Sequence, residues 1–60
     1  MIPNTGDKGK YTIIYADGKV GARWYDFECL GRYEGKAIIR TKAGHIHLRG
    51  EGYKFELEKN

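Results

Sequence analysis

The sequence lacks the features that stabilise many very small secreted domains and those that place a chain in a membrane. It contains one cysteine, Cys29, so no disulfide can form within the chain. It has one proline, and no apolar run approaches the roughly 20 residues that a membrane-spanning helix requires. The first ten residues, MIPNTGDKGK, contain no apolar stretch for a secretory signal peptide. We therefore expect a cytoplasmic protein that contacts no membrane, in a reducing compartment.

Patterns that indicate catalysis are also missing. No stretch of ten or more residues has the apolar spacing of an amphipathic helix, and no glycine-rich loop precedes a helix as phosphate-binding motifs require. A nucleophile–base pair can be drawn between Cys29 and His45 or His47, but nothing in the sequence places these side chains together. We predict no enzymatic activity and no cofactor.

The composition favours a small folded domain. Of the 60 residues, 40% are hydrophobic and 13% aromatic, which argues against disorder. A domain of this size buries only about 60% of the surface of its unfolded chain and is marginally stable alone. We therefore expect self-association into a homo-oligomer. The formal charge of +3 permits binding to a polyanion without requiring it.

The first half of the chain predicts a flexible N-terminal arm and two or three strands. Residues 1–9 are polar and glycine-containing, and residues 10–60 then form a single β domain. Strands are expected at 10–16 and 19–25, joined by a type I′ turn at Asp17-Gly18. The apolar alternation changes phase near residues 24–26 and continues over YDFECL, so we expect a bulge or bend there. GRYEG (31–35) reads as a loop.

The second half predicts three more strands, at 36–41, 45–49 and 53–58, with turns at 42–44 and 50–52. The predicted fold is all-β: a small antiparallel meander of five or six short strands, forming a curled sheet or a partly open SH3-like or OB-like barrel. The expected inward-facing residues are Ile13 or Ile14, Val20, Trp24, Phe27, Ile39, Ile46, Leu48, Tyr53, Phe55 and Leu57.

The strand HIHLR suggests a binding surface. If Ile46 and Leu48 point inward, alternation places His45, His47 and Arg49 on the outer face. Basic residues interleaved with aromatic residues on an open sheet are typical of surfaces that hold nucleic acid, in which Tyr33 or Tyr53 would stack on bases. The predicted nucleic-acid-binding residues are Lys36, Arg40, His47, Arg49 and Lys54. The alternative is an ordinary charged β surface.

Three other interpretations compete with nucleic-acid binding. His45 and His47 alternate on one strand face and can both reach one zinc ion, but a stable site needs three or four ligands; we predict no metal site. The second is a protein-binding module, or an inhibitor of the kind that phages and small replicons encode, which uses Tyr25, Arg32 and Tyr33, residue types enriched at protein interfaces. A structural homo-oligomer that associates through an edge strand is the third.

Overall fold

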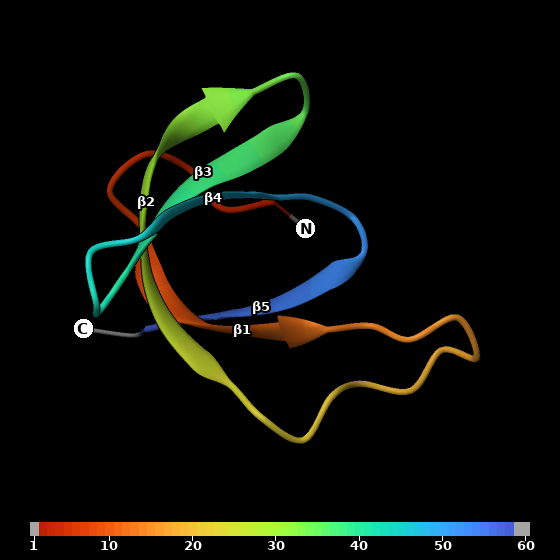
Figure 1. Cartoon of the computed structure of the whole chain (residues 1–60). Helices are drawn as coiled ribbons and strands as arrows, with labels where there is room; N and C mark the ends of the chain where they lie inside the picture. Colours follow the sequence, from red (N-terminus) through yellow and green to blue (C-terminus); the bar gives the residue numbers. More distant parts are fainter. Residues whose placement is uncertain (1, 59–60) are drawn as a thin grey trace.

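The structure is a computed structural model that describes residues 2–58, and within that range it contains five strands and no helix (Figure 1). The strands are β1 (Lys8–Ile13), β2 (Tyr25–Tyr33), β3 (Lys36–Thr41), β4 (Ile46–Arg49) and β5 (Tyr53–Leu57). All pairings are antiparallel, which confirms the all-β prediction. Residue 1 of the predicted arm and residues 59–60 of the predicted β domain lie outside the described residues.

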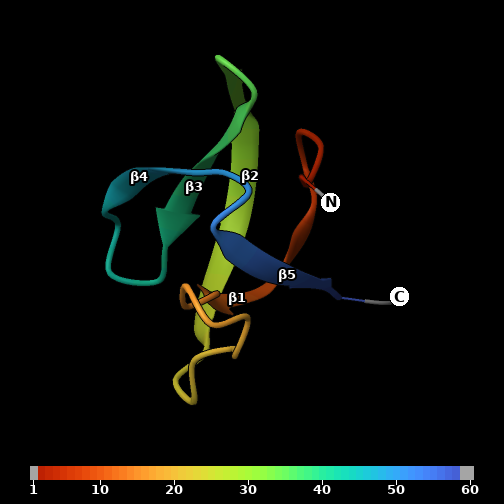
Figure 2. The ribbon, with the colours of Figure 1, turned by 90° about the vertical axis from the view of Figure 1, so that its right-hand side faces the viewer.

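The strands form one open sheet in the order β4-β3-β2-β1-β5. A simple meander would place β5 beside β4, but β5 instead pairs with β1 at the opposite edge. Only residues 50–52 separate β4 from β5 along the chain, so the sheet must curl until its two edge strands approach each other at one end. Figures 1 and 2 show this curl around the long strand β2. The sheet is therefore strongly concave, but it does not close into a barrel.

The type I′ hairpin lies at a different place from the one predicted. Its signature, positive φ at both central residues, occurs at Glu34 (51°) and Gly35 (75°), between β2 and β3. β2 therefore continues to Tyr33, through a segment predicted as a loop. At Asp17-Gly18 only the glycine has a positive φ, of 87°. The chain does turn there, since the Gly18 amide donates to the Tyr15 carbonyl, but through a different geometry.

The predicted strand at 19–25 is wrong. Residues 14–24 instead form a long connection, called the β1–β2 loop below, in which Ile14 and Val20 make one isolated bridge. The Gly21 amide donates to the Ile13 carbonyl and draws the loop back over the end of β1. Near residues 24–26, where a bulge or bend was expected within continuous strand, the loop ends and β2 begins at Tyr25.

β2 is a single nine-residue strand with an irregularity in its middle. Its register with β3 shifts between Cys29 and Gly31. Cys29 is buried with 1% exposure, whereas Leu30 is exposed. An extra residue of this kind bends a strand and increases its twist. The bend allows β2 to pair with β1 on one side and with β3 on the other while the sheet curls.

The N-terminal segment, expected to be a flexible arm, lies against β2. The sheet begins at Lys8, two residues earlier than predicted. The Cys29 amide donates to the Asp7 carbonyl over 2.7 Å, and Nε of Arg32 donates to the carbonyl of the buried Pro3 over 3.1 Å. These contacts cover the side of the sheet where Cys29 is buried.

The core lies on the concave face and is drawn from four of the strands. Its buried hydrophobic members are Tyr11, Phe27, Cys29, Ala37, Ile39 and Phe55, and Ile2, Tyr53 and Leu57 pack against them. The prediction was right for Phe27, Ile39 and Phe55. It was wrong for Val20, which is exposed, and Trp24 is only half-buried and lies outside this cluster.

β4 presents the opposite face to the one predicted. Ile39 of β3 pairs with His47, and cross-strand partners lie on the same face of a sheet. Because Ile39 is fully buried, His47 faces the concave side, and so does Arg49 two residues later. Ile46 and Leu48 point outward and are 53% and 44% exposed. The prediction that they face the core is therefore wrong.

A pair of isoleucines tests this assignment of the core. Ile39→Ala removes a fully buried side chain and is expected to lower the free energy of unfolding by about 2–5 kcal/mol. Ile46→Ala makes the same chemical change at an exposed position and is expected to cost under about 1 kcal/mol. Urea denaturation followed by circular dichroism measures both. Equal losses would mean that β4 is turned the other way.

Candidate functional site

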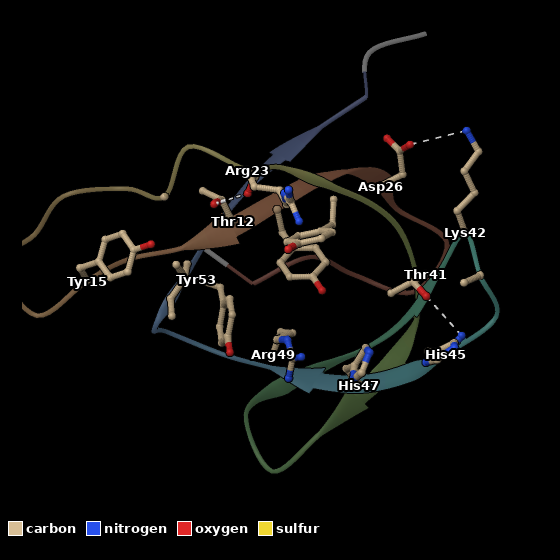
Figure 3. A pocket seen from close by; sticks show the side chains of 15 residues that line it. Thr12, Tyr15, Arg23, Asp26, Thr41, Lys42, His45, His47, Arg49 and Tyr53 are labelled. Atoms are coloured by element: carbon tan, nitrogen blue, oxygen red, sulfur yellow. Dashed lines mark hydrogen bonds and ion pairs between the residues drawn. The ribbon is translucent and has the colours of Figure 1, made fainter.

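One end of the concave face is hollowed into an open groove of about 650 Å³, between the β1–β2 loop and the turn that joins β3 to β4 (Figure 3). We call it the aromatic groove. Its aromatic side chains are Tyr11, Tyr15, Tyr25 and Tyr53. Its charged and imidazole side chains are Arg23, Asp26, Lys42, His45, His47 and Arg49. Three of these are permanent cations and one is a carboxylate, so the groove is net basic.

The floor of the aromatic groove is continuous with the core. The Tyr11 ring is 6% exposed, and its centroid lies 5.6 Å from that of Tyr25 and 5.9 Å from that of Tyr53. Tyr11 also contacts the core ring of Phe55, at 6.1 Å. Tyr25 rests on this support but is 47% exposed. The groove therefore presents an accessible aromatic ring on a tightly packed base.

Strand β4 supplies one wall of the groove through His47 and Arg49. The guanidinium carbon of Arg49 lies 5.0 Å from the Tyr53 ring centroid and 6.0 Å from that of Tyr11. This is the range of a cation–π contact. Nη1 of Arg49 donates to the Leu48 carbonyl over 3.0 Å, and its Nε is buried without a hydrogen-bond partner. One N–H group of the Arg49 guanidinium is thus hydrogen-bonded within the chain, and the guanidinium also lies over two rings.

The β1–β2 loop supplies the other wall. Thr12, which is 1% exposed, donates its hydroxyl to the Arg23 carbonyl over 2.7 Å. Gly21 packs closely on the same strand: a β carbon there would lie 2.7 Å from Oγ1 of Thr12 and 3.1 Å from Cγ2 of Ile13. These contacts fix the backbone that carries Arg23, and its side chain lies across the groove from His47 (Figure 3).

The turn between β3 and β4 closes one end of the groove. Oδ2 of Asp26 lies 3.8 Å from Nζ of Lys42, and both side chains are largely exposed. An exposed ion pair of this length contributes little to stability, so Lys42 is available to an anion. The His45 amide donates to Oγ1 of Thr41 over 3.2 Å. The rings of His45 and His47 lie 6.2 Å apart, and both line the groove.

The five residues predicted to bind nucleic acid do not share one face. His47 and Arg49 line the aromatic groove. Lys36, Arg40 and Lys54 alternate with buried residues and lie on the outer face of the sheet. Nη2 of Arg40 is also paired with Oε1 of Glu28 at 2.6 Å. The predicted single basic face is therefore split between the two sides of the sheet.

The three residues predicted to bind a protein partner are likewise separated. Tyr25 lies in the groove at the start of β2, and the 56% exposed Tyr33 lies at its other end. The eight residue steps between them correspond to at most about 26 Å along the strand. Arg32 donates to the carbonyls of Ile2 and Pro3, so its guanidinium is occupied within the chain.

Several groove residues were missed or assigned to other roles. The sequence patterns place Tyr11 in the strand at 10–16, Arg23 in the strand at 19–25 and Lys42 in the turn at 42–44. Each carries a suitable side chain, but only the long-range pairing of β1 with β5 and the fold of the β1–β2 loop bring them together. No local pattern in the sequence reports that juxtaposition.

Among residues 2–58, no group of three or more His, Cys, Asp or Glu side chains is placed to hold a metal ion. The described part of the chain also contains no helix long and apolar enough to cross a membrane. Comparisons with protein-family models, with curated proteins and with solved structures find no match for this chain.

Gly21 gives a test of how the loop wall is built. Gly21→Ala forces a β carbon against Oγ1 of Thr12, which is held in a buried hydrogen bond, so we expect a loss of about 1–3 kcal/mol in the free energy of unfolding. Gly52→Ala is the control, because a β carbon there meets nothing within 4 Å. The emission of Trp24, the one tryptophan, should shift to the red only in Gly21→Ala. Unchanged stability and emission would mean that the loop is not anchored at this point.

Proposed function

We propose that the protein is a non-catalytic binding module that contacts nucleic acid in the aromatic groove. The observation that carries this proposal is the meeting of an exposed tyrosine ring with an excess of cations in one open concavity. Aromatic rings stack on bases, and arginine and lysine neutralise phosphates. Such a partner uses both properties of the groove at once.

The cations of the groove differ in what they offer a phosphate. Arg49 is engaged with Tyr53 and with the Leu48 carbonyl. Arg23 and Lys42 are exposed at the rim. We therefore assign the phosphate contacts to Arg23 and Lys42, with His47 beside them in the wall.

We also propose that the curled sheet is a partly open barrel of the SH3-like or OB-like kind. The support is its topology: β1 pairs on both sides, and three residues join the two edge strands. Small barrels of this type carry binding surfaces of many kinds, so the architecture agrees with a binding role without specifying the ligand.

Two double variants with the same change in net charge test the groove. Arg23→Ala with Lys42→Ala is expected to weaken binding to a labelled oligonucleotide at low salt. It should also flatten the dependence of log Kd on log salt by about 0.7 for each lost phosphate contact. Arg40→Ala with Lys54→Ala removes two cations from the outer face and is expected to leave both quantities nearly unchanged.

Fluorescence anisotropy at several salt concentrations measures these affinities. If both double variants lose affinity equally, binding depends on net charge alone and the groove is not the site. If the unaltered protein binds no oligonucleotide at low salt, the proposal of a nucleic-acid partner is wrong.

A second candidate role is self-association, and the outer face of the sheet favours it. Leu30, Ile46 and Leu48 are exposed there, and Ile38 pairs with Leu48 between them. β4 is also an edge strand with an unpaired side, the feature through which sheets join. We propose that a second copy of this chain covers this apolar strip.

Two exposed aliphatic residues of equal accessibility test self-association. Leu48→Glu places a charge in the apolar strip, whereas Val20→Glu places one in the β1–β2 loop; both positions are 44% exposed. Sedimentation velocity over a range of concentrations is expected to show association of the unaltered chain and of Val20→Glu, and loss of association in Leu48→Glu. A chain that is monomeric at every concentration would refute this role.

A further inference from the structure

We infer that the nucleic acid held in the aromatic groove is single-stranded, with an unstacked base lying against Tyr25 and the flanking phosphates at Arg23 and Lys42. The inference rests on the proposed function and deepens it, because it names the form of the ligand and assigns a role to individual groove residues. Three features of the groove support it.

The first feature is shape. The exposed aromatic surface lies inside a concavity of about 650 Å³, in a chain whose Cα atoms extend over only 30 × 25 × 22 Å. In a duplex the faces of the bases are covered by their neighbours, and the grooves display only base edges. A ring in a concavity can reach a base face only when that base is unpaired and turned out of its stack. The volume of the groove lies within the range of sites that take small molecules.

The second feature is the unequal accessibility of the tyrosines. Tyr11 is buried beneath the groove, and Tyr53 is half-buried with the Arg49 guanidinium 5.0 Å from its ring. Tyr25 and Tyr15 are 47% and 54% exposed. Tyr25 is fixed by its contact with Tyr11, whereas Tyr15 is carried on the loop at the open end of the groove (Figure 3). Tyr25 is therefore the stacking platform.

The third feature is the arrangement of charge. Arg49 lies deep in the wall, with its Nε buried, and acts as a positioning residue that holds Tyr53 in place. Arg23 lies on the loop side of the groove and Lys42 beside Asp26 at the turn end (Figure 3). A single strand that crosses from the loop to the turn meets one cation on each side of its central base. The excess of cations over carboxylates favours this ligand over a neutral or basic peptide segment, which tyrosines also bind.

Four labelled probes of equal length separate the base contribution from the phosphate contribution. They are single strands of thymidylate and of uridylate of about 12 nucleotides, an abasic deoxyribose-phosphate strand, and a DNA duplex. Because stacking on an aromatic ring adds to phosphate contact, both base-bearing single strands are expected to bind at least about tenfold more tightly than the abasic strand. The duplex should bind no better than the abasic strand. A preference between thymidylate and uridylate identifies DNA or RNA as the source.

Variants of Tyr25 locate the stacking contact. Tyr25→Leu is expected to weaken binding of the base-bearing strands about tenfold and to leave abasic binding unchanged, which shows that the phosphate contacts and the fold survive. Tyr25→Phe keeps the ring and should bind as the unaltered protein does. Tyr33→Leu removes a tyrosine of similar exposure at the far end of β2 and should have no effect.

The outcomes separate the two proposals. Salt-dependent binding that requires Arg23 and Lys42 but is equal for all four probes, or is unaffected by Tyr25→Leu, would overturn the single-strand inference and leave the proposed function standing. Absence of binding to every probe at low salt would overturn both. A duplex bound more tightly than either single strand would also overturn the inference.

Discussion

The short connection between β4 and β5 is the constraint on which the rest of the structure depends. These strands lie at opposite edges of the sheet, yet only Gly50, Glu51 and Gly52 join them. The four Cα–Cα steps from Arg49 to Tyr53 span at most about 14 Å, so the edges must meet at one end and the sheet must curl. The curl gives the molecule one concave face. Apolar side chains fill part of that face as the core, and the unfilled part beneath the β1–β2 loop is the aromatic groove.

The concave face also explains why two polar side chains of β4, His47 and Arg49, face inward where apolar residues are expected. β4 has four residues and stands at an edge, so its inner side chains, His47 and Arg49, lie at the margin of the core and are half-buried. Arg49 extends along the rings of Tyr53 and Tyr11, which allows its apolar stem to pack while its charge contacts aromatic faces. An inward arginine is thereby tolerated, and Ile46 and Leu48 occupy the outer face instead.

Local patterns in the sequence predicted most of the strands and little of the site. β3 matches its predicted bounds, and β4 and β5 differ by one residue each, because short alternating segments between glycines define them. The predicted orientation of β4 was wrong. The alternation in HIHLR separates two sets of side chains, but it does not indicate which set the sheet buries. The chain does turn back at Asp17-Gly18 as predicted, with the Tyr15 amide donating to the Lys19 carbonyl and an isolated bridge between Ile14 and Val20. The predicted return strand does not continue beyond Gly21, and the Arg23 carbonyl accepts a hydrogen bond from the Thr12 hydroxyl instead.

Tyr11 connects stability and binding in this small chain. Its ring lies within about 6 Å of the rings of Tyr25 and Tyr53 in the groove and of Phe27 and Phe55 in the core. The floor of the groove is therefore also the roof of the core, and Tyr25 cannot shift without disturbing packing beneath it. A platform held this way loses little conformational freedom when a base stacks on it, which favours affinity. In 60 residues there is no room for a separate scaffold and site, so the same aromatic cluster serves as both.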